Sequence, residues 1–559
     1  MKTLLSKPML YDSQLKFRLE LALERLNRYP VNMNFVVMDL ERPSMRNRHC
    51  DWWTYDMSGR TLGFFSLAAD VTGKCSQKLR ELYERIMNLR NPSGTFGTVY
   101  WKELIGADDT YYIGTHFISG LVYYYRLTGD MRALDAADDA ASFLLRRGED
   151  AFKYIRKPNG PNVMFCWLTE AYAELYKETQ NEKYLDAIRY IAKECVGLIK
   201  GAHSHGYLTT LRGILKAAIY SGDEELAEFV RLRYQEIMDK GCILPNGDVS
   251  ESFLRLHRSE GCSIADWIML NLYYADYFGD DEAFARAEHS LWNALYFNQF
   301  VTGGFGHRNF NSRGYGSSVE EAWWCCTQNS GMALTEVARH VVTYRDNRLK
   351  LNFFIPGSYT LLTKNGEVSV SVTTRYPTEA KAVVKVVGTK DDIDIRIPEC
   401  MRDFTAERIE NEVGYELHLT GRIGHYVEKH GNSYVVKYGP LVIAPMFHTY
   451  EPGSRENTDT TVPEGYVQEG LSGENYKISP GCLSEDGFYH FERTPLPDWI
   501  VFEEGEMAEI GGGEVASAYV PVTFPDGTKK SLYFQPLCSA TSNLTLKDMI
   551  AFFDSVDEA

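Results

Sequence analysis

The sequence predicts a multidomain α + β protein in which an (α/α)6 helical toroid is followed by β-sandwich structure. Between residues 13 and 345, apolar side chains recur every three or four positions, the spacing of long amphipathic helices. From residue 346 onward, apolar and polar side chains alternate between Gly, Pro, Asn and Asp turns, which is typical of half-buried strands. This change of period places a helical unit before a β-rich one.

A repeated helix-turn-helix signature favours the toroid. Short turns separate two helical stretches at intervals of about 50 residues, the scale of a helical-hairpin repeat. The turns are centred on Gly73, Gly129, Gln180, Gly222 and Gly279. At each turn we expect one helix to end at a Gly-type cap and the next to begin at an Asp or Asn cap. Such hairpins form an open solenoid or a closed toroid, and long insertions between them favour a toroid with loops around one mouth.

The chain divides into three predicted units. We expect residues 1–345 to form the (α/α)6 toroid and residues 346–450 to form a β-sandwich. Residues 451–559 begin with a polar, turn-rich tract and continue with strand-like segments such as SLYFQPL. We therefore expect a C-terminal β-rich region with the pattern of a second sandwich.

Composition and charge limit the partners. The 559 residues include 76 Asp and Glu against 59 Lys and Arg, a net charge of −17, which is unfavourable for binding nucleic acid. No apolar run reaches the roughly 18 residues of a membrane helix, and MKTLLSKPML lacks the apolar core of a secretory signal. We therefore expect no nucleic-acid or membrane partner. The 11 dispersed cysteines argue against a secreted disulfide framework and for a reducing, cytoplasmic location.

Four side chains have the spacing of a metal site. Glu260 and Cys262 are separated by one residue, so an extended segment would direct both to one face. Cys325 and Cys326 are adjacent and precede TQNSGMALTEVARHVV, a predicted helix whose N-terminus favours thiolates. Three thiolates and one carboxylate make a tetrahedral donor set for Zn²⁺. The spacing alone is also explained by cysteines packed in a core and a solvated Glu260.

The order of these motifs resembles glycoside hydrolase family 127, the β-L-arabinofuranosidase family. The resemblance rests on a helical half before a β-sandwich and on E-x-C, LWNALYFNQF, the Cys pair leading into NFFIPGSYTLL, and YGPLVIA. It covers most of residues 50–450, and its most specific part is the ordered set of one glutamate and three cysteines. By this resemblance Glu260, Cys262, Cys325 and Cys326 bind zinc, and Cys325 is the nucleophile that forms a glycosyl-thioether intermediate.

The resemblance also implies a glutamate general acid/base upstream of E-x-C. Glu251 in SESFL is the best match, and Glu320 and Glu321, just before the Cys pair, are competitors. The reaction would be a retaining double displacement in which the glutamate protonates the departing oxygen and then activates water. The implied function is release of a terminal L-arabinofuranose, or a similar sugar, from an oligosaccharide.

Four further side chains are candidate sugar contacts. His116 follows YYIGT, and the resemblance also places a histidine near this position. It either donates a hydrogen bond to a sugar hydroxyl or serves as a capping or core histidine. His205 belongs to an H-x-H pair, and the absence of a neighbouring carboxylate in sequence favours sugar contact over metal binding. Tyr315 and Trp324 flank the Cys pair and offer rings for stacking on a sugar, although aromatic residues at helical spacing usually belong to the core.

Two other classes of function fit the same sequence. A carboxylate-only (α/α)6 glycosidase, unsaturated-uronyl hydrolase or sugar epimerase would use Asp108, Asp109 and Glu251, and its activity would survive metal removal. A non-catalytic glycan-binding protein would use zinc only to staple two loops. The sequence does not define the sugar, the linkage or the aglycone. It does not define subunit number either, and a homo-oligomer is compatible with it.

Overall fold

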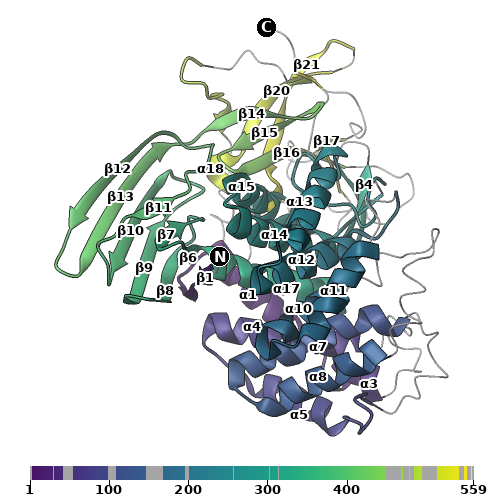
Figure 1. Ribbon diagram of the computed structural model, residues 1–559. Coiled ribbons are helices and arrows are strands. Elements are labelled where there is room, and N and C mark those ends of the chain that lie inside the picture. The colour runs from purple at the N-terminus through teal and green to yellow at the C-terminus, as the bar shows by residue number, and fades with distance from the viewer. Residues whose placement is uncertain are drawn as a thin grey trace.

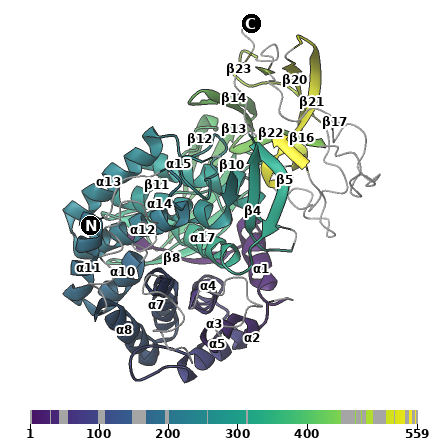
Figure 2. The ribbon, with the colours of Figure 1, turned by 90° about the vertical axis from the view of Figure 1, so that its right-hand side faces the viewer.

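Six helices form a closed inner ring in the computed structural model. The residues described are 3–28, 31–41, 55–97, 109–146, 168–194, 200–255, 257–300, 302–311, 314–448, 468–469, 477–478, 484–493, 513–524, 526–539, 547–550 and 555–556. The ring consists of α4 (Asp56–Thr72), α7 (Asp109–Thr128), α10 (Leu168–Thr179), α12 (Ser204–Ser221), α14 (Gly261–Phe278) and α17 (Cys326–His340). Each helix packs against the next, and α17 packs against α4, which closes the ring seen nearly along its axis in Figure 2.

A second layer of helices surrounds the ring. It consists of α1 (Gln14–Arg25), α5 (Gln77–Asn88), α8 (Met131–Arg146), α11 (Glu182–Glu194), α13 (Glu224–Asp239) and α15 (Asp281–Ser290). Each outer helix contacts at least one inner helix, and five of the six directly follow their main inner partner in the sequence of described helices. Within the described residues, six inner and six outer helices make the (α/α)6 toroid that the sequence predicts.

The predicted turns occur where the inner helices end. Gly73, Gly222 and Gly279 are C-caps of α4, α12 and α14, with left-handed φ angles of 69°, 78° and 71°. Gly129 and Gln180 follow α7 and α10, also with positive φ. Glycine adopts this conformation without steric cost, which explains its use at these ends. The expected Asp caps are found before α13 and α15, whereas α5 begins at Ser76 instead.

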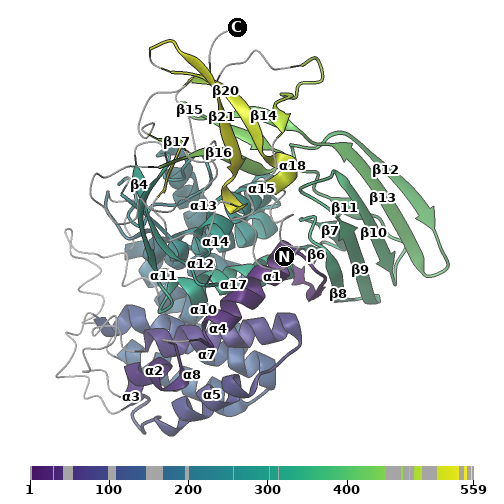
Figure 3. The ribbon, with the colours of Figure 1, turned by 180° about the vertical axis from the view of Figure 1, so that it is seen from behind.

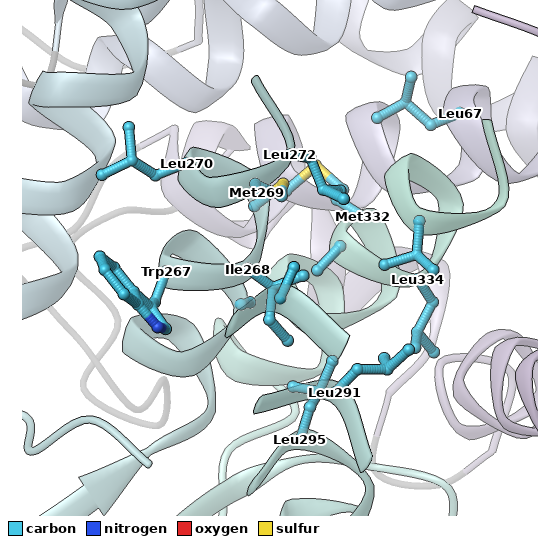
Figure 4. Close-up of a cluster of buried hydrophobic side chains, with 14 of the residues drawn as sticks. Leu67, Trp267, Ile268, Met269, Leu270, Leu272, Leu291, Leu295, Met332 and Leu334 are labelled. Atoms are coloured by element: carbon cyan, nitrogen blue, oxygen red, sulfur yellow. The ribbon is translucent and has the colours of Figure 1, made fainter. Parts of the chain in front are cut away.

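The core of the toroid lies around α14. This helix is buried along most of its length because α12, α15 and α17 pack against it. Figure 4 shows its apolar side chains interleaved with those of α4, α17 and the π-helical segment η2 (Leu291–Leu295). The labelled side chains are Leu67, Trp267, Ile268, Met269, Leu270, Leu272, Leu291, Leu295, Met332 and Leu334. A polar residue on α14 is therefore surrounded by protein rather than by water.

Two sheets follow the toroid, at the side of the helical body in Figures 1 and 3. A four-stranded sheet has the order β1-β6-β7-β11, and a six-stranded sheet has the order β12-β13-β10-β9-β8-β2. Their strands are β1 (Leu4–Leu5), β2 (Lys7–Leu10), β6 (Val342–Arg345), β7 (Arg348–Leu351), β8 (Gly357–Thr363), β9 (Gly366–Thr374), β10 (Lys381–Val387), β11 (Ile393–Ile395), β12 (Arg402–Glu410) and β13 (Gly414–Arg422). Side chains alternate between buried and exposed along β8 to β10, as the period of two predicts.

A third set of strands joins the C-terminal region to the toroid. It comprises β3 (Arg258–Glu260), β4 (Gly306–Asn311), β5 (Gly314–Glu321), β14 (His425–His430), β15 (Ser433–Tyr438), β16 (Leu441–His448), β17 (Gln468–Glu469), β18 (Lys477–Ile478), β19 (Glu492–Arg493), β20 (Ala518–Thr523), β21 (Lys529–Pro536), β22 (Lys547–Ile550) and β23 (Ser555–Val556). Strand β22 pairs with both β16 and β5. The shorter helices are α2 (Met33–Val36), α3 (Met38–Glu41), α16 (Tyr296–Asn298) and α18 (Gly513–Ala516), with η6 (Leu537–Ser539) as a 3-10 turn.

The N-terminal strands belong to a different unit from the one that the sequence predicts for them. Strand β1 pairs with β6, and β2 pairs with β8, so residues 4–10 lie in the sheets although the prediction includes them in the toroid. These strands extend sheet edges formed more than 300 residues later, a pairing that local periodicity does not reveal. The boundaries at residues 345 and 450 therefore stay a prediction. Among the described residues, no helix is long and apolar enough to cross a membrane.

Replacement of Gly59 by alanine tests the close packing of the ring. A Cβ at Gly59 of α4 would lie 2.4 Å from the Cα of Phe117 on α7. Gly59→Ala should therefore lower the free energy of unfolding by about 1–3 kcal/mol, measured by urea denaturation. Gly63→Ala on the same helix is the control, because its Cβ would meet its nearest atom at an ordinary 3.5 Å. Equal stability of the two variants would contradict the close α4–α7 contact.

Candidate active site

The N-terminal turns of the inner helices meet at one end of the ring. Hydrogen bonds join Arg60 of α4 to His205 of α12, and His205 to Asp266 of α14. The sulfur atoms of Cys262 on α14 and Cys326 on α17 lie 3.5 Å apart. Because each residue lies in the first two turns of its helix, this end of the toroid collects the predicted site residues.

Three cysteine sulfurs form a compact buried cluster. Cys326 lies 3.5 Å from Cys262 and 3.7 Å from Cys325, measured between sulfur atoms. As predicted, the Cys pair begins a helix, with Cys325 as the N-cap residue of α17. Cys262 and Cys326 are fully buried, whereas Cys325 keeps 6% of its surface exposed. Cys325 is therefore the member of the cluster that a ligand in the mouth can reach.

The thiols of the cluster differ in acidity. Hydrogen bonds from Cys262 and Cys326, together with the charge of Arg60, lower the pKa of Cys325 well below its usual range. Burial raises the pKa of Cys262 and that of Cys326. Cys325 is thus the thiolate of the group, and thiolates are the reactive form of cysteine.

Glu260 lies beside the sulfur cluster. One of its carboxylate oxygens, a nitrogen of His307 and the sulfur of Cys326 all lie within 4.8 Å of one another. The hydroxyl of Ser263 donates to Oε2 at 2.6 Å, and Nε2 of His203 lies 3.5 Å from the same oxygen. Glu260 ends β3 and is the N-cap residue of α14, so Cys262 is already helical and E-x-C is not extended throughout. The turn into the helix, rather than strand alternation, brings the carboxylate and the sulfur together.

His307 is a site residue that the sequence analysis missed. It lies directly opposite Glu260 in the β3–β4 pair and opposite Glu320 in the β4–β5 pair. Its Nε2 is 3.9 Å from Glu260 Oε1, and its Nδ1 is 3.7 Å from Glu320 Oε2. Side chains in such register share one face of a sheet. The signal was hidden because His307 is 47 residues from Glu260 in the chain and has no motif of its own.

His205 is held inside the protein by both ring nitrogens. Nδ1 bonds to Oδ2 of Asp266, and Nε2 lies 3.0 Å from the guanidinium of Arg60. The Arg60 group can only donate, so Nε2 accepts and the proton of the neutral ring sits on Nδ1. The structure therefore places His205 between two charged groups, and His203 of the same H-x-H pair lies closer to Glu260.

Asp266 joins four polar partners around it. It accepts hydrogen bonds from Thr209 at 3.1 Å and Asn329 at 3.2 Å, and it also bonds to His205 and Arg212. Burial opposes ionisation, but His205 and Arg212 outweigh this effect and lower the pKa of Asp266 to about 2. A charged residue in the apolar first half of α14 is the sequence signal that could have identified Asp266.

His116 faces the axis of the ring. It lines a narrow cavity along the axis together with Arg60, Glu170 and Arg212. Its ring stacks on that of His205 with centroids 5.7 Å apart. Burial and the charge of Arg60 hold the pKa of His116 well below its usual range, so the ring is neutral. A neutral imidazole at this position can donate or accept one hydrogen bond toward the mouth.

The three candidate acids occupy different positions. Glu251 accepts two hydrogen bonds from Arg258, at 2.5 and 2.6 Å. Glu320 lies on the other side of the same guanidinium, 3.6 Å from Nη1. Glu321 instead bonds to Arg25 of α1 at 2.5 and 3.1 Å. Successive residues of β5 point to opposite faces, so Glu320 faces the site and Glu321 binds the outer helix.

The remaining candidates are only partly described. Trp324 is half-buried directly before Cys325 and meets the ring of Trp323 edge to face at 5.1 Å. Tyr315 lies in β5 opposite Phe310, and its side chain is outside the described residues. Asp108 and the side chain of Asp109, the acids of the carboxylate-only alternative, also lie outside them.

The chain is similar to solved hydrolase structures over its whole length. A GH127 β-arabinofuranosidase is 15% identical, with 99% of this chain and 97% of that chain covered and a TM-score of 0.70. A GH127 β-L-arabinofuranosidase from Geobacillus stearothermophilus T6 is 13% identical, with 98% and 100% covered and a TM-score of 0.70. Residues 72–330 match the family model described as the β-L-arabinofuranosidase GH127 catalytic domain. No curated protein sequence matches the chain at a significant level.

The catalytic-domain match, on a toroid with a polar mouth, defines the protein as a glycoside hydrolase. Its substrate is therefore a glycoside. Within this class, residues 72–330 match the catalytic domain of glycoside hydrolase family 127. The resemblance drawn from the ordered glutamate and cysteines is thereby confirmed at the level of the family.

Asp266→Asn tests whether this carboxylate organises the mouth. Removing its charge takes away one of the two buried carboxylate partners of Arg212, so the free energy of unfolding at pH 7 should fall by about 3 kcal/mol in urea denaturation. The control Asp186→Asn removes an exposed partner of Arg189 and should change stability by less than about 0.5 kcal/mol.

The pH dependence gives a second readout for Asp266. Its pKa of about 2 in the folded protein is below the value of about 3.9 expected for an unfolded chain. Its ionisation therefore contributes stability above about pH 4, and this contribution is lost as the pH falls through about 2. The stability difference between wild type and Asp266→Asn should shrink over that range, and a constant difference would argue against the assignment.

Proposed function

We propose that the protein is a retaining glycoside hydrolase that releases a terminal L-arabinofuranose, or a similar sugar, from oligosaccharides. The observation that carries the proposal is the cluster of Cys262, Cys325 and Cys326 at the mouth of a family 127 toroid. Two similar solved structures are described as β-arabinofuranosidases. The preference for this sugar is taken from those relatives.

The donor set fits a zinc ion. Sulfur ligands at about 2.3 Å in a tetrahedron lie about 3.8 Å apart, close to the separations of 3.5 and 3.7 Å in the cluster. Glu260, Cys262, Cys325 and Cys326 would hold the ion, with three soft donors and one carboxylate. Bound zinc would keep the cysteine ligands deprotonated at neutral pH.

In the first step, Sγ of Cys325 attacks the anomeric carbon. The carbon–sulfur bond forms as the bond to the leaving oxygen breaks, and Glu251 transfers its proton to that oxygen. In the second step Glu251 removes a proton from water, the water oxygen attacks the same carbon, and Cys325 leaves as the thiolate. Two displacements at one carbon retain its configuration. The small exposed surface of Cys325 supports its role as the attacking atom.

The surroundings of Glu251 support its role as acid/base. One of its oxygens lies within 4.8 Å of ligand atoms of His203 and Glu260, so the carboxylate borders the metal-binding group. Arg258 holds it in one orientation. Glu320 contacts the same arginine, but its side chain is 49% exposed. Water therefore reaches Glu320 more easily, which makes it the less suitable proton donor.

Zinc content tests the donor set directly. Protein purified under reducing conditions should contain about one zinc per chain by elemental analysis, and Cys262→Ala should lose it. The control Cys75→Ala alters an exposed cysteine far from the cluster in the chain and should keep the metal. Folded, reduced wild-type protein without zinc would reject the donor set and favour a carboxylate-only glycosidase.

Activity on an aryl β-L-arabinofuranoside tests the nucleophile. Cys325→Ala should lower turnover by at least about 10³-fold, because the first displacement loses its attacking atom. Cys75→Ala should leave turnover unchanged. Full turnover by Cys325→Ala would rule out the thioether step, while zinc binding without turnover in the wild type on a panel of furanosides would favour a glycan-binding protein.

A comparison of leaving groups distinguishes Glu251 from Glu320. Glu251→Gln should lower kcat/KM by about 10²–10⁴-fold on an alkyl glycoside, and less on a p-nitrophenyl glycoside, whose leaving group needs little protonation. Glu320→Gln is the matched control on the other side of Arg258 and should affect both substrates equally and weakly. The reverse pattern would assign the acid/base role to Glu320.

A further inference from the structure

A second cavity lies at the other end of the toroid, where the inner helices finish. It has a volume of about 620 Å³, within the range of small-molecule sites. Its lining comes from the last turns of α7, α10, α12, α14 and α17 and from strand β1 (Leu4–Leu5). Helix α12 has 18 residues, which span about 27 Å, so this cavity is remote from the cysteine cluster at the opposite ends of the helices.

Four cations from four helices line this cavity, and one of them, Lys216 of α12, pairs with Glu170 and Glu174 at 2.7 Å each. Arg126 of α7 pairs with Glu174 at 2.5 Å and Glu178 at 2.6 Å. Arg339 of α17 pairs with Glu336 at 3.1 Å. The partial negative charge at helix C-termini favours cations. This charge and the paired glutamates together stabilise both arginines. A bound ligand is therefore not required to explain why these two arginines lie at the cavity.

Lys177 of α10 is different. Its ammonium lies 5.0 Å from the ring centroid of Tyr220 and lines the cavity, but it has no carboxylate within 4.0 Å among the described residues. Burial and the charges of Arg126 and Arg339 outweigh the attraction of nearby acids and lower the pKa of Lys177 to about 8. At pH 7 the ammonium of Lys177 is therefore still protonated in most molecules. Lys177 is exposed on the cavity side and feels the charges of Arg126 and Arg339, so an anion in the cavity would stabilise its ammonium.

The rest of the wall is suited to a hydroxylated ring. Four tyrosines line it, and two of them also donate to acids on its floor: Tyr123 to Glu174 at 3.4 Å and Tyr273 to Glu336 at 3.0 Å. The other two are Tyr220 and Tyr277. Aromatic faces beside hydrogen-bonding carboxylates are a common combination in sugar sites, since the ring stacks while the acids accept from hydroxyls.

We propose that this cavity binds an anionic monosaccharide, a sugar acid or sugar phosphate, with the anionic group on Lys177 and the ring against the tyrosine wall. The site is separate from the hydrolytic site and does not depend on its mechanism. Arg126 and Arg339 supply additional positive potential, and strand β1 covers part of the rim.

Calorimetric titration of the full-length protein tests the site. Glucuronate or glucose 6-phosphate should bind, and the two ligands distinguish a carboxylate from a phosphate preference. Neutral glucose should not bind. Lys177→Gln should raise Kd at least about tenfold, the effect of losing one charge-assisted hydrogen bond. The control Lys193→Gln removes an exposed lysine of α11 and should leave Kd unchanged, and both variants should keep the zinc content of the wild type.

Chemical labelling locates the bound ligand. In wild-type protein at pH 8, an amine-acylating reagent should modify Lys177, and the ligand that binds should protect this residue but not Lys193, as read by peptide mass spectrometry. The proposal fails if neither anion binds, if Lys177→Gln binds as tightly as wild type, or if labelling of Lys177 is unaffected by ligand. Inorganic phosphate binding as tightly as glucose 6-phosphate would overturn the sugar part of it.

Discussion

The mouth of the toroid depends on the buried carboxylate of Asp266. It is fully buried in α14, and its two oxygens bond to His205, Thr209 and Arg212 of α12 and to Asn329 of α17. The same amide of Asn329 also donates to the backbone carbonyl of Cys262 at 3.1 Å. One charge therefore sets the positions of α12 and α17 relative to α14, and the sulfurs of Cys262 and Cys326 meet because those helices are held together.

The direction of the helices explains why the thiolate lies at this mouth. The backbone N–H groups at the start of α17 have no partners within the helix, and the helix dipole adds partial positive charge there. Arg60 supplies a full charge nearby, and its place is set by Asp56 at 2.6 Å and by His205. A closed ring in which every inner helix starts at the same end gathers these effects at one site. At the opposite end the carbonyl termini collect, which accounts for the arginines found there.

The sequence predicts the parts of this arrangement that are local. Helical period, the glycine turns and the Cys pair before a helix depend on neighbouring residues, and the structure bears them out. Arg60 and His205 are 145 residues apart, and neither carries a motif that reveals the other. Glu320 and Glu321 are equivalent in sequence, but strand alternation sends only the first toward the site. What could not be predicted is therefore the long-range pairing of charges, which the closure of the ring determines.

The ion pairs along the ring axis fix the relative positions of the helices more than they add to the free energy of unfolding. Arg212 bonds Glu170 through two nitrogens, and Lys216 bridges Glu170 and Glu174 at 2.7 Å each. Desolvation offsets most of the attraction in such buried pairs, so apolar side chains would stabilise the helices about as well. Apolar contacts, however, allow α10 and α12 to slide by fractions of a turn, whereas a two-point bond allows one register. That register is transmitted to the mouth because Arg212 also bonds Asp266 of α14, the helix that carries Cys262.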